Sequence, residues 1–377
     1  MNFELSEEQR AVAELAGQIL SDRVTPDRLS AMDQAGEGVD RDTWSELAKA
    51  NLLGISLTEE VGGSELGFLA TGLILEEVGR RAARLPLLPT VVMGAMPIDA
   101  FGSGELRRRL LPGVVSGGTL LTAALVEAGS EPAEPATRAT RDGDTWRLDG
   151  VKICVPSGLD AGAILVPAAT EAGGTGVFVL DPAGAGVTRV AEECTDGVPE
   201  ARLELSGASV DAGDVLGDPE GDPRRAVEII EWIEERTMAG LALMMGGACS
   251  EALRLTAEYA KTREQFDRPI GSFQAVGQRV ADAYIDTEAV RLTALQAAWR
   301  IDAGMDASRA VAIAKFWAAE GGQRVVLAAH HLHGGMGVDR DYPLHRYFLM
   351  AKKLELTLGG ASESLRRLGR ALAEEPV

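Results

Sequence analysis

Apolar residues in the first part of the chain, residues 1–118, recur at helical spacing. Gln9 stands three residues after Ser6, which predicts a capping box at the start of the first helix. A longer helix is predicted over residues 73–80, and three prolines within residues 86–97 predict a non-helical connection after it. We therefore expect an N-terminal helical domain.

Residues 119–221 lose the helical spacing and contain short β-rich runs separated by turn dipeptides such as Asp142-Gly143 and Asp149-Gly150. The dipeptide Gly173-Gly174 marks a further turn. The predicted strands are residues 145–148, 151–155, 163–166, 176–180 and 201–205. Short strands at close spacing predict a small antiparallel β-barrel as the middle domain.

Residues 222–377 are again helical and contain few prolines. Small and apolar side chains at alternating steps of four and three form one stripe of a long helix: Val276, Val280, Ala283, Thr287, Val290 and Ala294. This spacing is typical of a bundle with left-handed packing. We predict a C-terminal four-helix bundle, and thus an α+β chain with the order α, β, α.

Charge and composition exclude several classes of function. The formal net charge is −20 and the pI is near 4.7, which disfavours nucleic acid as a partner. An anionic ligand would need basic residues close to its site. No apolar run reaches eighteen residues, so we expect no membrane span. The acidic start has no basic segment followed by an apolar one, which predicts a cytoplasmic protein.

Neither the cysteines nor the histidines have the spacing of a metal site. The chain has three cysteines, far apart and without a CxxC pair, so neither a disulfide framework nor a zinc ribbon is predicted. All four histidines fall in one region: His330, His331, His333 and His345. Side chains of neighbouring helical residues diverge, and no acidic ligand accompanies them. We predict no metal site.

Two motifs carry candidate chemistry. The first occupies residues 261–274 and reads KTREQFDRPIGSFQ, in which Arg263 and Phe266 place a cation and a ring at a helix-loop-helix corner. The second is HGGMG, in which Gly334 and Gly335 expose bare backbone. A guanidinium binds a pyrophosphate through two parallel hydrogen bonds, and backbone N–H groups bind anions. The simpler readings are a helix-end salt bridge for the arginine and a helix C-cap for the glycines.

Together the two motifs resemble the C-terminal helical domain of the acyl-CoA dehydrogenases, and the resemblance extends over essentially the whole chain. That family consists of FAD enzymes. In it, the flavin ring lies on the β domain of one subunit, while the pyrophosphate and adenosine contact the helical domain of a neighbour. The resemblance implies that Arg263, Phe266, Gly334 and Gly335 bind FAD, with His331 at the place of a glutamine. Asp267 departs from the usual glycine.

The β-domain half of the family's flavin site is not present in this sequence. Val126 and Ala128 stand where the family has threonine and proline, and Cys154 stands where it has a tryptophan. Pro156 replaces a hydroxyl residue and has no N–H group. Each lost hydrogen bond or ring contact costs about 1 kcal/mol or more. We therefore expect that this β domain does not hold a flavin.

The family's catalytic carboxylate is also missing. Leu358 or Gly359 occupies one of its two known places, and Thr237 occupies the other. Glu235 lies two residues from Thr237, a shift that turns a helical side chain by about 160°. An insertion in the helix would restore it as a base, so Glu235 stays an alternative to an exposed charge in the run Glu231, Glu234, Glu235.

The interpretation that we favour is a base-less subunit of a heterotetrameric (α2β2) FAD-dependent acyl-CoA dehydrogenase. Such enzymes are known in bacterial degradation of steroid side chains, and the carboxy-terminal LGGASESLRRLGR resembles their base-less subunits. The partner subunit would carry the catalytic glutamate and bind the acyl-CoA, with electron-transferring flavoprotein as acceptor. The alternatives are a self-sufficient homotetramer with Glu235 as base, and a non-catalytic acyl-CoA-binding or scaffold protein.

Overall fold

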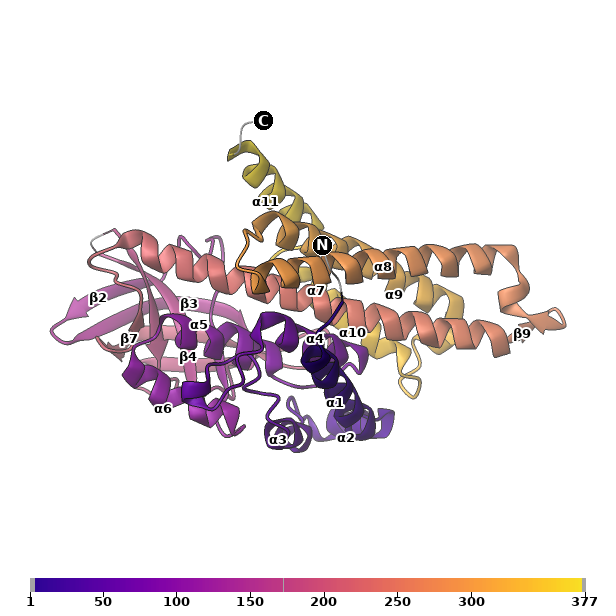
Figure 1. The fold of residues 1–377 in the computed structure, drawn as a ribbon, viewed down its shortest axis with the longest axis horizontal. Helices are drawn as coiled ribbons and strands as arrows, with labels where there is room; N and C mark the ends of the chain where they lie inside the picture. Colours follow the sequence, from indigo (N-terminus) through magenta and orange to yellow (C-terminus); the bar gives the residue numbers. More distant parts are fainter. Residues whose placement is uncertain (1–3, 172, 375–377) are drawn as a thin grey trace. The chain divides into compact units, whose positions relative to one another are not determined.

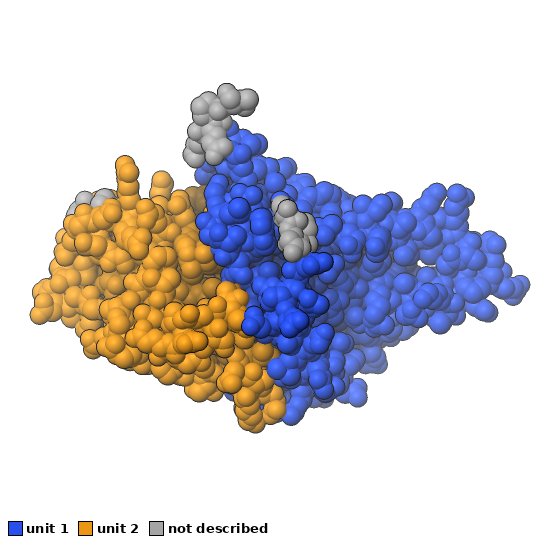
Figure 2. Space-filling view, viewed as in Figure 1, with its two compact units in different colours: residues 1–43, 68–85, 238–377 blue, residues 44–67, 86–237 orange. Residues whose placement is uncertain are grey.

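The computed structural model describes residues 4–171 and 173–374, which form two compact units (Figure 2). Unit 1 comprises residues 1–43, 68–85 and 238–377, and unit 2 comprises residues 44–67 and 86–237. Each unit therefore collects segments from different parts of the chain. The units do not test the boundaries after residues 118 and 221, so these boundaries stay a prediction.

Among residues 4–118, helices are the regular elements, as predicted. The helices are α1 Glu7–Arg23, α2 Pro26–Ala35, α3 Arg41–Lys49, α4 Gly67–Arg80, α5 Met96–Phe101 and α6 Gly104–Val115. The capping box is confirmed, because Ser6 Oγ accepts from the Gln9 N–H and Gln9 Oε1 accepts from the Ser6 N–H. The expected connection over residues 86–97 is instead largely a buried π-helix, Leu88–Ala95. Its proline lies at the start, where no N–H is needed.

Unit 2 contains one curled sheet (Figure 1). The strands are β1 Leu121–Ala123, β2 Arg138–Asp142, β3 Thr145–Val155, β4 Ala163–Thr170, β5 Thr175–Leu180, β6 Val187–Glu192, β7 Glu200–Asp211 and β8 Val215–Leu216. Their order is β6-β7-β3-β2-β4-β5-β8, with β1 beside β4. The pairing leaves β6 and β8 at the ends among the described residues, so the sheet is curled but open. It is also mixed, because β4 pairs in parallel with β1 and β2.

Strand β3 is continuous over two of the predicted strands, residues 145–148 and 151–155. Asp149-Gly150 was expected to be a turn, but it lies at a bulge, where the register against β7 shifts. A Cβ at Gly150 would lie 2.8 Å from the backbone of Thr137, so the glycine permits a close approach. The turn at Asp142-Gly143 is confirmed.

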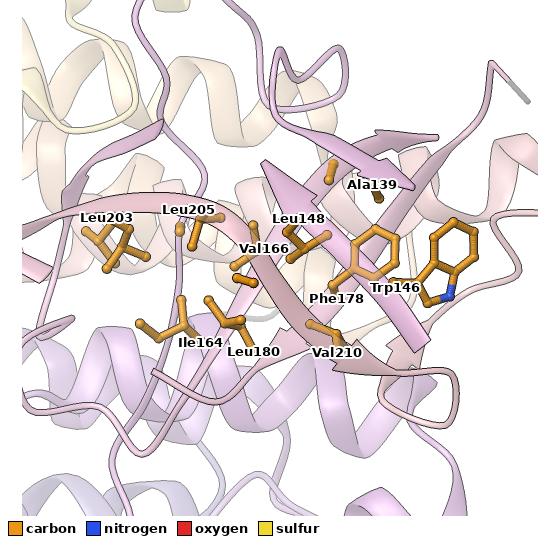
Figure 3. Packing of buried hydrophobic residues seen from close by; sticks show 14 of the residues in the cluster. Ala139, Trp146, Leu148, Ile164, Val166, Phe178, Leu180, Leu203, Leu205 and Val210 are labelled. Atoms are coloured by element: carbon orange, nitrogen blue, oxygen red, sulfur yellow. The ribbon is translucent and has the colours of Figure 1, made fainter. Parts of the chain in front are cut away.

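The sheet curls around its own apolar core (Figure 3). Trp146 from β3 and Phe178 from β5 meet edge to face, with ring centroids 5.3 Å apart. Leu148 and Leu203 are fully buried in the same core. Alternate residues of β3 and β7 point inward, which explains why these strands show the period of two. This core fixes the strands around the two segments that were compared with the family's flavin site. One segment holds Val126 and Ala128, and the other holds Cys154 and Pro156.

The C-terminal part is a helical bundle, as predicted, with one additional helix. Its helices are α7 Pro223–Thr262, α8 Gln274–Asp302, α9 Ser308–His333, α10 Leu344–Leu356 and α11 Ala361–Glu374. In unit 1, α4 and α7 cross where both carry glycine. A Cβ at Gly79 would overlap the carbonyl of Met244, and one at Gly247 would overlap the carbonyl of Glu76. Glycine therefore permits backbone contact at this crossing.

The stripe predicted on α8 is buried only in its second part. Ala283, Thr287, Val290 and Ala294 are buried, whereas Val276 and Val280 are half-exposed. The apolar face thus continues past the core of this chain. Within the described ranges, no helix combines the length and the apolar character needed to cross a bilayer.

Candidate functional site

The corner after α7 is a hairpin rather than a simple loop. Strands β9 Glu264–Gln265 and β10 Arg268–Pro269 form it, and Figure 1 shows it at one end of the long helices. Phe266 and Asp267 between them both have left-handed φ, +55° and +62°. Both values fit a type I′ turn, and aspartate is one of the few non-glycine residues that adopt a positive φ readily. The departure from glycine at Asp267 is therefore accommodated by the local backbone.

Arg263 stands at the base of this hairpin and is exposed. Its N–H donates to the carbonyl of Tyr259 at 2.8 Å, and its carbonyl accepts from the Ile270 N–H at 2.8 Å. Both ends of its backbone are thus fixed. Its guanidinium forms no salt bridge with any described residue, so the simpler reading of a helix-end salt bridge is not supported.

Phe266 presents its ring to solvent, with 87% of the residue exposed. The ring meets the ring of Phe273 edge to face, with centroids 6.1 Å apart, and Arg268 lies 4.0 Å over the ring of Phe273. A left-handed backbone costs a non-glycine residue about 1 kcal/mol or more. A strained, exposed aromatic residue at a hairpin tip is typical of a contact surface.

The glycine motif forms a short 3₁₀ segment, Gly334–Gly337, directly after α9. Gly334 has φ +57° and ψ −130°, and its N–H donates to the carbonyls of His330 and His331. The helix-cap reading is therefore correct for Gly334. No atom lies within 4 Å of a Cβ built at Gly334 or Gly335, so the surface above them is open. An anion can approach this backbone directly.

His331 is exposed in the last turn of α9, next to this open backbone. His330 turns the other way and packs against Phe348, with centroids 4.9 Å apart. Among the described residues, no group of three or more His, Cys, Asp or Glu side chains could hold a metal ion. The divergence of the neighbouring histidines agrees with helical geometry.

A buried histidine brings the two motifs together. The ring of His333 stacks on Tyr259 with centroids 4.3 Å apart, and Tyr259 lies one turn before Arg263. His333 precedes Gly334 in the chain. The ends of α7 and α9 therefore meet at this stack. Tyr259, His333 and Tyr342 were not predicted as site residues; the clustering of histidines near the glycines is the one signal of them in the sequence.

In unit 2 the segment of Val126 lies beside the segment of Cys154. The Ile153 N–H donates to the carbonyl of Val126 at 3.0 Å. Lys152 Nζ lies 2.5 Å from Glu127 Oε1 in a buried ion pair. Burial lowers the pKa of Lys152 to about 8, against the opposing effect of Glu127. The two segments are thus joined by a backbone hydrogen bond and by a buried ion pair.

The side chains of these two segments do not fit a flavin ring. Val126 offers no hydroxyl, and Pro156 offers neither a hydroxyl nor an N–H group. Cys154 has a left-handed φ of +51°, and its N–H donates to the carboxylate of Glu192 at 3.2 Å. This amide is therefore engaged within the sheet. By contrast, the open glycines and the exposed Arg263 do fit a pyrophosphate.

The resemblance predicts the family's base at Thr237 or at Leu358 or Gly359, and none of these side chains carries a carboxylate. Thr237 is buried, and its hydroxyl donates to the carbonyl of Ile233 at 2.7 Å. Leu358 and Gly359 form a left-handed turn after α10. Glu235 is half-buried on α7. Its neighbour Glu234 is 6% exposed. The simpler reading expected the whole run of glutamates to face solvent, and this is wrong for Glu234.

A buried lysine holds the α10 end of that turn. Lys315 Nζ donates to the carbonyls of Leu354 and Glu355 at 2.9 and 2.8 Å. Burial lowers the pKa of Lys315 to about 7, although Glu355 opposes the shift. A cation at a helix C-terminus is favourable to the helix dipole. The lysine thus caps the C-terminal end of α10, next to Leu358 and Gly359.

Comparison with known proteins agrees with this geometry. Residues 6–118 match the family model "Acyl-CoA dehydrogenase, N-terminal domain", and residues 233–372 match "Acyl-CoA dehydrogenase, C-terminal domain". The chain is 40% identical to acyl-CoA dehydrogenase FadE27 of Mycobacterium tuberculosis, with 100% of both chains covered.

Solved structures are similar over the same length. A chain of the ChsE4–ChsE5 complex from Mycobacterium tuberculosis matches with a TM-score of 0.94 at 41% identity, covering 100% of both chains. A variant of the Tcur3481–Tcur3483 steroid ACAD matches with a TM-score of 0.90 at 42% identity, covering 98% of both. The chain belongs to the acyl-CoA dehydrogenase family, whose typical cofactor is FAD.

Proposed function

We propose that the chain is the base-less subunit of a heteromeric (α2β2) acyl-CoA dehydrogenase. The partner subunit holds the flavin ring, the catalytic glutamate and the acyl-CoA. This chain contributes contacts to the dinucleotide part of that FAD across the interface. The observation that carries the proposal is Arg263. Its side chain is exposed, its backbone N–H and carbonyl are both hydrogen-bonded, and its guanidinium has no ion pair among the described residues.

The residues of this chain have distinct roles in the proposal. Arg263 binds pyrophosphate oxygens through its forked donors. Gly334 and Gly335 let the anion approach the backbone, and His331 donates a further hydrogen bond. Phe266 covers an apolar part of the cofactor. Bound FAD supplies the acceptor for the hydride that leaves the β carbon, while a base on the partner removes the proton from the α carbon.

Two further features support a partner of this kind. The two similar solved structures are named as a complex and as a steroid ACAD, which favours a heteromer acting on a steroid side-chain CoA ester. Several large apolar residues of unit 1 are also exposed: Phe266 at the hairpin tip, and Ile285, Leu292, Leu356, Leu365 and Leu372 on the C-terminal helices. Such a surface is typical of a buried interface. We further propose electron-transferring flavoprotein as acceptor and the cytoplasm as location.

The test is to purify the chain alone and with its co-expressed partner subunit. We expect a colourless, inactive chain, and a yellow, active complex by absorbance and dehydrogenase assay. In the complex, Arg263→Lys should reduce FAD affinity about tenfold, because lysine cannot form the forked pair. Arg108→Lys, an exposed arginine on α6, is the matched control.

The alternatives predict other results. A yellow, active homomer that loses its activity on Glu235→Gln would establish the self-sufficient enzyme. A chain that stays colourless and never contributes to turnover would establish the scaffold protein.

A further inference from the structure

The loop between α9 and α10 is closed by one side-chain contact. His333 ends α9, and Tyr342 lies at the far end of the loop, just before α10. His333 Nε2 lies 3.1 Å from the hydroxyl of Tyr342, and the two ring centroids are 5.2 Å apart. The open glycines, Gly334 and Gly335, lie between these two residues in the chain. The contact therefore fixes both ends of the segment that carries them.

The geometry also assigns the proton on the imidazole. His333 Nδ1 lies 2.8 Å from the carbonyl of Ala329, and a carbonyl oxygen can only accept. Nδ1 therefore carries the hydrogen and donates it. In the neutral ring, Nε2 has a lone pair and accepts from the hydroxyl of Tyr342.

The same imidazole contacts the other motif. Its face stacks on Tyr259 at an interplanar angle of 23°. The carbonyl of Tyr259 accepts from the Arg263 N–H at 2.8 Å. One ring thus touches the loop of the glycines on one side and the helix end of the arginine on the other.

We propose that His333 and Tyr342 are positioning residues, which hold the glycine loop and the Arg263 corner in the arrangement that binds the FAD pyrophosphate. The proposal rests on the function proposed above. Neither residue needs to touch the cofactor. The neutral His333 with its hydrogen on Nδ1 is the form that holds the loop closed.

The charged and titratable groups around this pair favour the neutral form. Tyr259 on α7 and His330 on α9 lie near His333, and Glu251 and Arg254 on α7 act on Tyr342 with opposite signs. From the α10 side, His345 Nδ1 lies 2.7 Å from the Tyr342 carbonyl. Burial lowers the pKa of His333 below its ordinary value of 6.5 and raises the pKa of Tyr342.

The sign of the pH dependence follows. In an open loop, His333 has its ordinary pKa of 6.5, and in the closed loop its pKa is lower. Closure is therefore fully favoured above pH 6.5 and weakens as the pH falls below that value. Protonated Nε2 can no longer accept from Tyr342.

The experiment measures FAD affinity in the complex of this chain with its partner. Flavin is stripped from the complex, and FAD is titrated back by fluorescence from about pH 8 to about pH 5.5. Tyr342→Phe removes only the hydroxyl, and we expect the Kd to rise about fivefold to tenfold at neutral pH. Thr293→Val is the control, because that hydroxyl donates within its own helix, and its Kd should stay within about twofold.

His333→Gln provides the second readout. The amide can accept from Tyr342 but does not titrate, so its Kd should lack the additional rise that the native complex shows as the pH falls. If this variant does not assemble, His333→Asn, which keeps a donor for the Ala329 carbonyl, takes its place. A Tyr342→Phe complex with native affinity, or a glutamine variant that follows the native pH profile, would refute the positioning role.

Failure of the proposed function gives a different pattern. If this chain does not contact FAD, Arg263→Lys also leaves the Kd unchanged. If Arg263→Lys weakens FAD and Tyr342→Phe does not, the cross-subunit site stands and only the positioning role is wrong.

Discussion

Two buried lysines make structural contacts beside the segments that were compared with the family's site. Lys315 caps the carbonyl end of α10 beside the turn of Leu358 and Gly359. Lys152 pairs with Glu127 and so joins the segment of Val126 to the segment of Cys154. Each lysine is held by oxygen atoms of its own chain, so local packing accounts for its burial.

The lowered pKa of Lys315 makes a prediction about stability. An unfolded lysine has a pKa of 10.5, and in the fold the pKa is about 7, so the unfolded chain binds more protons between these values. The free energy of unfolding should therefore rise with pH from about 7 to about 10. Lys315→Met should show a flatter rise in urea denaturation over this range. Equal slopes in the two proteins would show that Lys315 is charged in the fold.

At the scale of elements, the sequence predicted those whose burial follows a simple period. The helices, β4, β5 and β7 were predicted because apolar spacing marks them. β6 was missed because most of its residues are exposed, so no apolar alternation exists. β2 was missed for the same reason. The parallel pairs of β4 depend on contacts between distant segments, which a local pattern does not contain.

The crossing of α4 and α7 offers a test at this scale. Gly247→Ala places a Cβ against the backbone of α4, so we expect a loss of about 3 kcal/mol in the free energy of unfolding. Gly277→Ala on α8 meets no atom within 4 Å and should be neutral or stabilising by up to about 1 kcal/mol. Chemical denaturation of the two variants measures the contrast. Equal effects would mean that the helices can separate without cost.

At the scale of the whole molecule, the candidate site was only partly visible in the sequence. Arg263 and Phe266 were found because they lie in one continuous motif. The stack of Tyr259 on His333 was not, because those residues are far apart in the chain and only the packing of α7 against α9 joins them. The stripe on α8 was likewise predicted to pack within a bundle, yet Val276 and Val280 are half-exposed and other apolar residues of the C-terminal helices are exposed. The reason is that a stripe on a helix does not say which chain covers it.

These exposed residues predict where assembly can be broken. Leu365 on α11 is 50% exposed, and we expect Leu365→Glu to prevent the heteromer from forming, because the carboxylate would lose its water at the interface. Leu15 on α1 is 41% exposed, and Leu15→Glu should leave the assembly unchanged. Light scattering after size exclusion separates the two results. An intact Leu365→Glu complex would place the interface elsewhere.

The contact between Glu192 and the Cys154 amide also bears on stoichiometry, because it occupies an amide of this β domain. Under the proposed function this domain holds no flavin ring, so one kind of subunit in the assembly is loaded and the other is not. A fully saturated preparation would then contain half as many moles of yellow chromophore as of polypeptide, and adding more cofactor would not raise that ratio.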